Sequence, residues 1–256
     1  MFEKYSNARM VAKLIACVFV YYLFASGLAF AFSKTPGTPV DMPNWRIGYA
    51  MSSLYPAKVT RAYGVNVDAG WTSYVHNDMH FLSRTEFDKI KESTPSYDGV
   101  GLALGVPVTN KRQVSGTNVL PDTIYIEWAS ISNRRFFTTK WTLSKELKQL
   151  MSSKETYTRW DGFETTCYRT DIIFGFLPNG NTKIWLRGCG EYRYITEIEA
   201  DVELQADTFG NDASIYRENY GDLIYKRAQE LDVPITPIPW DKVSKVYANE
   251  EFIKVN

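Results

Sequence analysis

Apolar and polar residues alternate along most of the chain in short stretches, with the period of two that is typical of strands. Thr123–Ile131 gives the most regular example, because its largest apolar residues share one face and Glu127 lies on the other. Those apolar residues are Ile124, Ile126 and Trp128. Similar stretches, rich in Val, Ile, Tyr, Trp and Thr and separated by turn residues, predict strands. The predicted strands are Trp45–Met51, Lys58–Asn66, Trp71–Val75, Thr123–Ile131, Arg135–Leu143, Thr166–Leu177 and Thr182–Arg187.

Helical patterns are few. Ser83–Ser93 and Ser144–Ser152 each begin with a serine, whose hydroxyl can cap exposed backbone amides. Two more helices are expected near the C-terminus, at Tyr220–Asp232 and Asp241–Phe252, and prolines between them prevent one continuous helix. The expected fold class is therefore α+β, a β-dominated antiparallel sheet or sandwich with a few short helices.

The N-terminus has a different pattern. An uncharged apolar run, Leu14–Phe32, follows a segment with three basic residues, and it is long enough to cross a bilayer core of about 30 Å as a helix. The basic flank precedes the run, so the positive-inside rule places the rest of the chain outside the cytoplasm. We expect residues 1–32 to be a signal sequence or transmembrane anchor and 33–43 a Pro/Gly/Thr-rich linker. Residues 44–256 would then form a single periplasmic β-rich domain with a helical C-terminal tail.

Three fates of the apolar run are open. It can stay in the inner membrane as an anchor through residues 14–32. It can be cleaved after Ala29-Phe30-Ala31, a small-residue site of the signal-peptidase kind. It can also be lipidated at Cys17, although Lys13 leaves little apolar sequence before this cysteine. All three fates place the domain in the periplasm or an equivalent exterior.

Two turns predict hairpins. Ser132–Arg134 separates two predicted strands, and Pro178–Asn181 contains Asn-Gly, which tolerates the positive φ values of a type I′ turn. A hairpin at Pro178–Asn181 sets Cys167 and Cys189 on neighbouring strands. In an oxidising compartment these two cysteines are expected to form a disulfide, and two free buried thiols are the alternative.

The chain carries 29 basic and 29 acidic side chains, so its formal net charge is zero. Nucleic acids are bound by clustered Lys and Arg, and this balance therefore argues against a nucleic-acid partner. Without residues 1–32 the remainder is mildly acidic, which gives it no general attraction to anionic lipid head groups.

Few residues suit catalysis or metal binding. His76 and His80 have a spacing that, on a helix, would place both imidazoles on one face for a metal. Asn77 and Asp78 between them favour a turn with two solvated histidines instead. The chain also has no nucleophile elbow, phosphate-binding loop or C-x-x-C pair. We therefore expect no catalytic residues, no cofactor and no metal, so that the protein is not an enzyme.

Glu191–Leu204 is the candidate for a binding surface. As one strand, it would bury a mostly apolar side and expose an acidic side. The partner-binding candidates on the acidic side are Glu197, Glu199, Asp201 and Glu203. Complementary charge would speed the encounter with a basic partner. An ordinary solvated face and a helix from Ile195 onward are the alternatives.

Five stretches carry a family resemblance. They are Pro43–Trp45; Leu120–Ser130; Arg135–Leu143 with the helix that ends at Met151; Phe174–Gly180 with Lys183–Gly188; and Ile238–Lys242. In this order they resemble the bacterial envelope family known as domain of unknown function 2931, over about residues 43–245. The resemblance implies a small exported, lipoprotein-like protein. Some members of that family look like immunity proteins encoded beside type VI secretion lipase effectors.

These features together predict a membrane-tethered periplasmic immunity protein that binds and neutralises a type VI secretion effector, with a phospholipase as the expected partner. A structural or housekeeping envelope protein without a toxin partner is the alternative. An envelope enzyme with a metal at His76 and His80 is a third hypothesis, which metal analysis of the purified protein would test.

Overall fold

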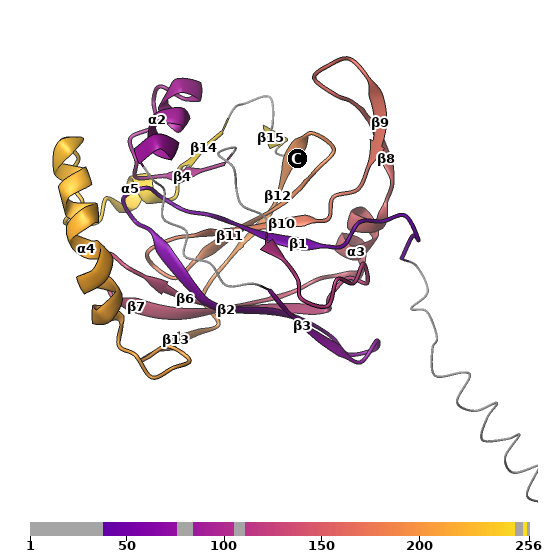
Figure 1. Cartoon of the computed structure of the whole chain (residues 1–256), viewed down its shortest axis with the longest axis horizontal. Helices are drawn as coiled ribbons and strands as arrows, with labels where there is room; N and C mark the ends of the chain where they lie inside the picture. Colours follow the sequence, from indigo (N-terminus) through magenta and orange to yellow (C-terminus); the bar gives the residue numbers. More distant parts are fainter. Residues whose placement is uncertain (1–37, 76–83, 105–110, 249–252, 255–256) are drawn as a thin grey trace, which may run out of the picture. The chain divides into compact units, whose positions relative to one another are not determined.

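The computed structural model describes residues 38–75, 84–104, 111–248 and 253–254 (Figure 1). Two larger β-sheets and two short two-stranded sheets make up most of this part of the chain. The predicted β-dominated fold with a few short helices is confirmed. Over the described ranges, no helix is long and apolar enough to cross a membrane. Residues 14–32, His76 and His80 lie outside these ranges.

The first sheet has six strands in the order β15-β12-β11-β10-β1-β5. Their bounds are β15 (Ile253–Lys254), β12 (Glu191–Ile198), β11 (Thr182–Gly188), β10 (Asp171–Phe176), β1 (Arg46–Ala50) and β5 (Lys111–Arg112). The predicted antiparallel arrangement is wrong at two pairs, because β1 runs parallel to β10 and β12 runs parallel to β15. Parallel neighbouring strands need a long connection. The connection between β1 and β10 contains four strands of the second sheet.

The second sheet has five strands in the order β13-β7-β6-β2-β3. Their bounds are β13 (Val202–Leu204), β7 (Arg135–Thr142), β6 (Thr123–Ser130), β2 (Ala57–Asn66) and β3 (Trp71–Val75). All neighbouring pairs are antiparallel. The hairpin predicted at Ser132–Arg134 joins β6 to β7, and Arg134 there has a positive φ of 57°.

The two sheets pack face to face around one hydrophobic core. Trp128 of β6 lies 4.6 Å from Phe176 of β10, measured between ring centroids. Polar contacts also cross the interface, since the buried Thr139 and Thr182 hydroxyls lie 2.9 Å apart. The alternation in β6 therefore has the predicted cause, which is burial of one face of the strand against the other sheet.

The outer faces of the two sheets are covered differently. On the first sheet, Ile173 and Trp185 pack with Leu102 of the small sheet formed by β4 (Leu102–Ala103) and β14 (Val246–Tyr247). Helix α2 (Arg84–Ser93) packs on that small sheet through Phe87 and Ile90. β10 is therefore buried along its whole length.

On the second sheet, helix α4 (Ala213–Glu230) packs against one end of the outer face, where Ile224 and Ala228 contact Ala129 and Phe136 (Figure 1). The part of this face that carries Tyr74 is exposed. We call this part the open face of the second sheet.

The remaining helices match those predicted from the sequence only in part. Helix α3 (Lys145–Ser152) is capped by Ser144, whose hydroxyl accepts from the Leu147 amide as predicted. α4 begins earlier than predicted, at an N-cap formed by Asp212. The helix predicted at Asp241–Phe252 is correct only at its start: α5 (Trp240–Val243) ends at Val243, and the chain then pairs with β4 as strand β14. Tertiary pairing of Val246 and Tyr247, a β-branched and an aromatic residue, outweighs helix propensity there.

The hairpin between β10 and β11 forms at the predicted residues. Its Gly180 amide donates to the Leu177 carbonyl over 2.9 Å, which makes a turn with Pro178 in second position. Within residues 177–181, positive φ falls on Gly180 alone, at 101°. The predicted type I′ turn is therefore wrong, because it needs positive φ at both central residues of the turn. The first central residue of the observed turn is Pro178, whose ring holds φ at about −65°.

Candidate partner-binding site

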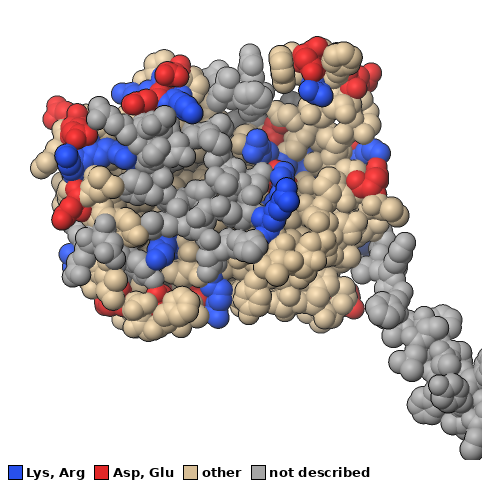
Figure 2. Space-filling view, in the orientation of Figure 1, with Lys and Arg blue, Asp and Glu red and all other residues tan. Residues whose placement is uncertain are grey.

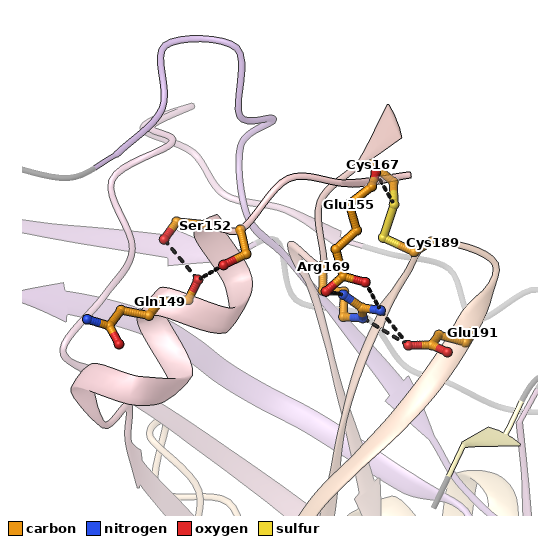
Figure 3. A network of polar contacts seen from close by, with 8 residues as sticks. Gln149, Ser152, Glu155, Cys167, Arg169, Cys189 and Glu191 are labelled. Carbon is orange, nitrogen blue, oxygen red and sulfur yellow. Dashed lines mark hydrogen bonds and ion pairs between the residues drawn. A yellow bond between two sulfur atoms is a disulfide. The ribbon is translucent and has the colours of Figure 1, made fainter. Parts of the chain in front are cut away.

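A buried arginine lies at the base of a hairpin formed by β8 (Glu155–Thr158) and β9 (Glu164–Cys167) (Figure 3). The Arg169 side chain donates to Glu191 from Nε over 3.0 Å and from Nη2 over 2.6 Å. It also donates to Glu155 over 2.7 Å, and this hydrogen bond raises the pKa of Arg169 above its ordinary value. Arg169 thus connects the first residue of β8 to the first residue of β12.

The predicted disulfide is present beside this arginine. Cys167 and Cys189 are bonded, with their Cα atoms 5.3 Å apart, and Figure 3 shows the bridge next to Arg169. Cys189 follows β11 directly, so the bond links the hairpin to the first sheet. Tyr157 packs beside Gly190, where an added Cβ would lie 3.3 Å from the tyrosine ring. A covalent bond, buried charges and packing therefore all fix the base of the hairpin.

The tip of this hairpin, residues 159–163, exposes two large aromatic side chains. Trp160 is 94% exposed and Phe163 is 70% exposed. Hydrogen bonds within the tip hold its backbone: the Arg159 amide donates to the Phe163 carbonyl over 2.8 Å, and the Gly162 amide donates to the Arg159 carbonyl over 2.9 Å. Gly162 has a φ of 84°, which a glycine adopts without strain.

The sequence interpretation missed this hairpin and joined Thr166–Leu177 into one strand. Asp161-Gly162 between two Thr-rich stretches was the available signal, because Asp-Gly is a common hairpin turn. The expected strand breaks at Arg169, which turns inward to the two glutamates and separates β9 from β10.

A row of tyrosines crosses the open face of the second sheet. Tyr74 of β3 and Tyr125 of β6 both lie opposite Tyr63 of β2 in the strand register. Ring centroids are 5.6 Å apart for Tyr63 and Tyr74, and 5.1 Å apart for Tyr63 and Tyr125. Lys140 of β7 continues the row, with its Nζ 5.9 Å from the centre of the Tyr125 ring. We call these four residues the tyrosine row.

Charged groups border the tyrosine row. Arg61 of β2 forms an ion pair with Glu127 of β6, and its guanidinium lies 5.7 Å from the centre of the Tyr63 ring. Partial burial raises the pKa of Tyr63 above its ordinary value. Tyr74 is 54% exposed, so the row is accessible from solvent at this end.

The four acidic candidates do not lie on one strand. β12 ends at Ile198, and the chain then crosses to the second sheet, where β13 pairs with β7. The Asp201 amide starts this new pairing by donating to the Thr138 carbonyl over 2.8 Å. Glu199 and Asp201 are exposed in the crossing segment. The acidic side chains therefore extend from one sheet to the edge of the other.

Two of these carboxylates already have basic partners within the chain. Glu197 lies 2.6 Å from the Lys183 ammonium, and Glu203 lies 2.6 Å from the Arg135 guanidinium. The hydrogen bond from Arg135 lowers the pKa of Glu203. Partial burial would raise the pKa of Glu197, but hydrogen bonds from Lys183 and Asn181 together outweigh it and lower that pKa. Partner binding by the four acidic residues stays a prediction.

Other features give little chemistry. A cavity of about 280 Å³ lies beside α4, and its lining combines isoleucines, including Ile131 and Ile224, with polar residues such as Asn133 and Thr236. Among the described residues, no group of three or more His, Cys, Asp or Glu could hold a metal. The described surface offers an acidic edge, an aromatic tip and a tyrosine row, and aromatic residues such as those of the tip and the row are enriched at protein interfaces.

Comparison with known proteins gives one match. Searches of curated proteins and of solved structures find no similar protein. The family model described as "Protein of unknown function (DUF2931)" matches residues 33–241, which cover most of the chain. The chain therefore belongs to the DUF2931 family.

Proposed function

We propose that this protein is an exported binding protein, tethered to the inner membrane by residues 14–32, that neutralises a lipase effector by direct contact. The tyrosine row on the open face of the second sheet carries the proposal. Tyrosine and arginine are enriched at protein interfaces, because each combines a large contact area with hydrogen-bonding groups. Here the aromatic side chains stand on a β-sheet, so little conformational entropy is lost when a partner binds.

The geometry of the row favours a protein partner over a sugar. The Tyr63 and Tyr125 rings are inclined by only 16° and face each other, so their faces are already in contact. A sugar ring that stacks on an aromatic residue needs a free ring face. The row instead offers phenol hydroxyls and the Lys140 ammonium, groups that bind carboxylates and backbone carbonyls.

Two observations support an effector outside the cytoplasm. The Cys167–Cys189 disulfide is a bond that persists in oxidising compartments, which include the periplasm. The family resemblance described above connects some members with lipase effectors of type VI secretion. Binding without chemistry is sufficient for this role, because an inhibitor needs only to cover the active site or the membrane-binding surface of its target.

Capture experiments test the proposal. The full chain, immobilised in detergent, is exposed to proteins secreted by the source bacterium, and the captured material is assayed for hydrolysis of phosphatidylglycerol vesicles. We expect a lipase to be retained, and to be lost in a Tyr74→Ser/Lys140→Glu variant. A variant with Val40→Ser and Lys89→Glu, exposed positions in the segment before β1 and in α2, serves as the matched control. A bait that retains no lipase contradicts the proposal and favours a structural envelope role.

A further inference from the structure

We infer that the tip of the β8–β9 hairpin is the anchor of the interface, and that Trp160 and Phe163 enter an apolar cleft of the protein partner. This inference rests on the proposed function, because it concerns the same partner. It assigns a binding role to residues outside the tyrosine row and outside the acidic segment.

Trp160 is far more exposed than the tryptophans of the core. Trp45, Trp128 and Trp185 are between 0% and 2% exposed and Trp240 is 52% exposed, whereas Trp160 is 94% exposed. Phe163 is 70% exposed on the same tip, so one short turn presents two large apolar side chains to water. Soluble proteins seldom leave such groups together at the surface unless they contact a partner. Tryptophan is also among the residues most enriched at the energetic centres of protein interfaces.

The hairpin presents these side chains in an ordered form. The tip is closed by one hydrogen bond between Arg159 and Phe163, by a second from Gly162 to Arg159, and by an ion pair of 2.9 Å between Arg159 and Asp161. At the base, the disulfide and Arg169 attach both strands to the first sheet. A tip that is already ordered loses less entropy on binding than a flexible loop, which favours tight binding.

The charges of the hairpin favour a protein cleft over a lipid surface. The two basic side chains within residues 154–167 are both paired with acids, Lys154 with Asp41 at 2.5 Å and Arg159 with Asp161. Attraction to anionic lipids needs unpaired Lys or Arg near the membrane surface. In Figure 2 the end of the hairpin, at the upper right, carries acidic and basic side chains close together rather than a basic patch.

The shape of the hairpin points to the kind of cleft. A projecting tip can bury both aromatic rings only in a concave site, and the uncharged rings need an apolar lining. A lipase has such a site, because its active-site cleft must accept the acyl chains of the substrate. The tip would occupy this cleft and compete with the lipid.

A killing assay tests the inference even when the lipase has not been identified. Attacker cells of the source bacterium are mixed with recipient cells that lack this chain, and survival of the recipients is counted. Recipients are complemented with the full chain, with Trp160→Ala/Phe163→Ala, or with Phe209→Ala, which removes an aromatic side chain that is 79% exposed elsewhere. Immunoblots confirm equal amounts of each variant, and gel mobility confirms the Cys167–Cys189 disulfide.

The inference expects full protection by the wild-type chain and by Phe209→Ala, and loss of protection with Trp160→Ala/Phe163→Ala. Full protection by the double variant overturns the inference while the proposed function stands. Survival of recipients without any copy of the chain overturns both.

A second measurement addresses lipid directly. The emission of Trp160, obtained as the difference between the full chain and Trp160→Phe, is recorded with phosphatidylcholine vesicles and with phosphatidylglycerol vesicles. The inference expects no blue shift with either, and a blue shift with vesicles would overturn it in favour of membrane insertion.

Discussion

The Arg169 guanidinium lies 2.6 Å from the Glu191 carboxylate, and the two side chains are only 5% and 8% exposed. Each charge is therefore removed from water and depends on the other for compensation. Because Arg169 also reaches Glu155, the same group holds the β8–β9 hairpin on the first sheet. The geometry of the hairpin is thus set by buried electrostatics as well as by the disulfide.

Arg169→Met should destabilise the fold by about 3–5 kcal/mol, because it leaves the buried Glu191 carboxylate without its cation. Urea unfolding of the full chain at pH 7 measures this change in free energy. Arg135→Met is the matched control, because Arg135 also pairs with a glutamate, Glu203, but the two side chains are 39% and 46% exposed. A loss below about 1 kcal/mol for Arg169→Met would show that the pair contributes no more than a surface ion pair.

Removal of the disulfide by Cys167→Ser/Cys189→Ser should cost about 3 kcal/mol, since the bond closes a loop with a sequence separation of 22 residues. Amide exchange of residues 155–167 should accelerate more than exchange in β6, because the bond attaches this hairpin to the first sheet. Hydrogen exchange read by mass spectrometry measures the exchange rates of residues 155–167 and of β6, with Cys17→Ser as the control. Uniform acceleration throughout the domain would contradict a local role for the disulfide.

Trp160→Ala should change the free energy of unfolding by less than about 0.5 kcal/mol, as expected for an exposed side chain away from the core. Trp128→Ala should cost about 3–5 kcal/mol, because Trp128 fills the core between the two sheets. Thermal or urea unfolding of the two variants gives the comparison. A large loss with Trp160→Ala would mean that the tip packs on the domain and is not a free binding element.

The contribution of Glu197 should depend on pH. Its folded pKa lies below the ordinary value of 4.5, so its ionised form stabilises the fold above that value. This stabilisation is lost as the pH falls through the folded pKa. The free energy of unfolding of the wild type should therefore exceed that of Glu197→Gln by about 0.5–1 kcal/mol at pH 7. This difference should shrink below pH 4.5.

Urea unfolding at pH 7 and at acid pH measures this difference, with Glu199→Gln as the control for the substitution itself. An unchanged or larger difference at acid pH would contradict the assigned Lys183–Glu197 pair.

Local sequence patterns predicted the long strands of the second sheet and β1 and β11 of the first sheet, but they missed the two-residue strands β5 and β15. Ile124, Ile126 and Trp128 alternate because one face of β6 is buried, and that requirement can be seen in the sequence. Ser144 could similarly be predicted as the N-cap of α3, because capping depends only on residues a few positions away. The Cys167–Cys189 bond was predicted correctly, but Cys167 lies on β9, which pairs with β8 and not with the strand that leads to Cys189.

Features that depend on distant residues were not predictable. Glu191–Leu204 reads as one amphipathic strand, yet Asp201 finds its partner in β7 of the other sheet. Val246 and Tyr247 similarly form a strand because β4 lies beside them. The tyrosine row also depends on register, since its members come from two pairs of consecutive strands, β2–β3 and β6–β7, that are far apart in the sequence.

The most direct test of the central claim is a titration of the captured lipase with the full chain, read as hydrolysis of phosphatidylglycerol vesicles. Our account predicts that activity falls to the background level near one chain per lipase molecule. It also predicts that the Tyr74→Ser/Lys140→Glu variant needs a large excess for the same effect. Undiminished hydrolysis in the presence of excess wild-type chain would contradict the claim that this protein neutralises a lipase.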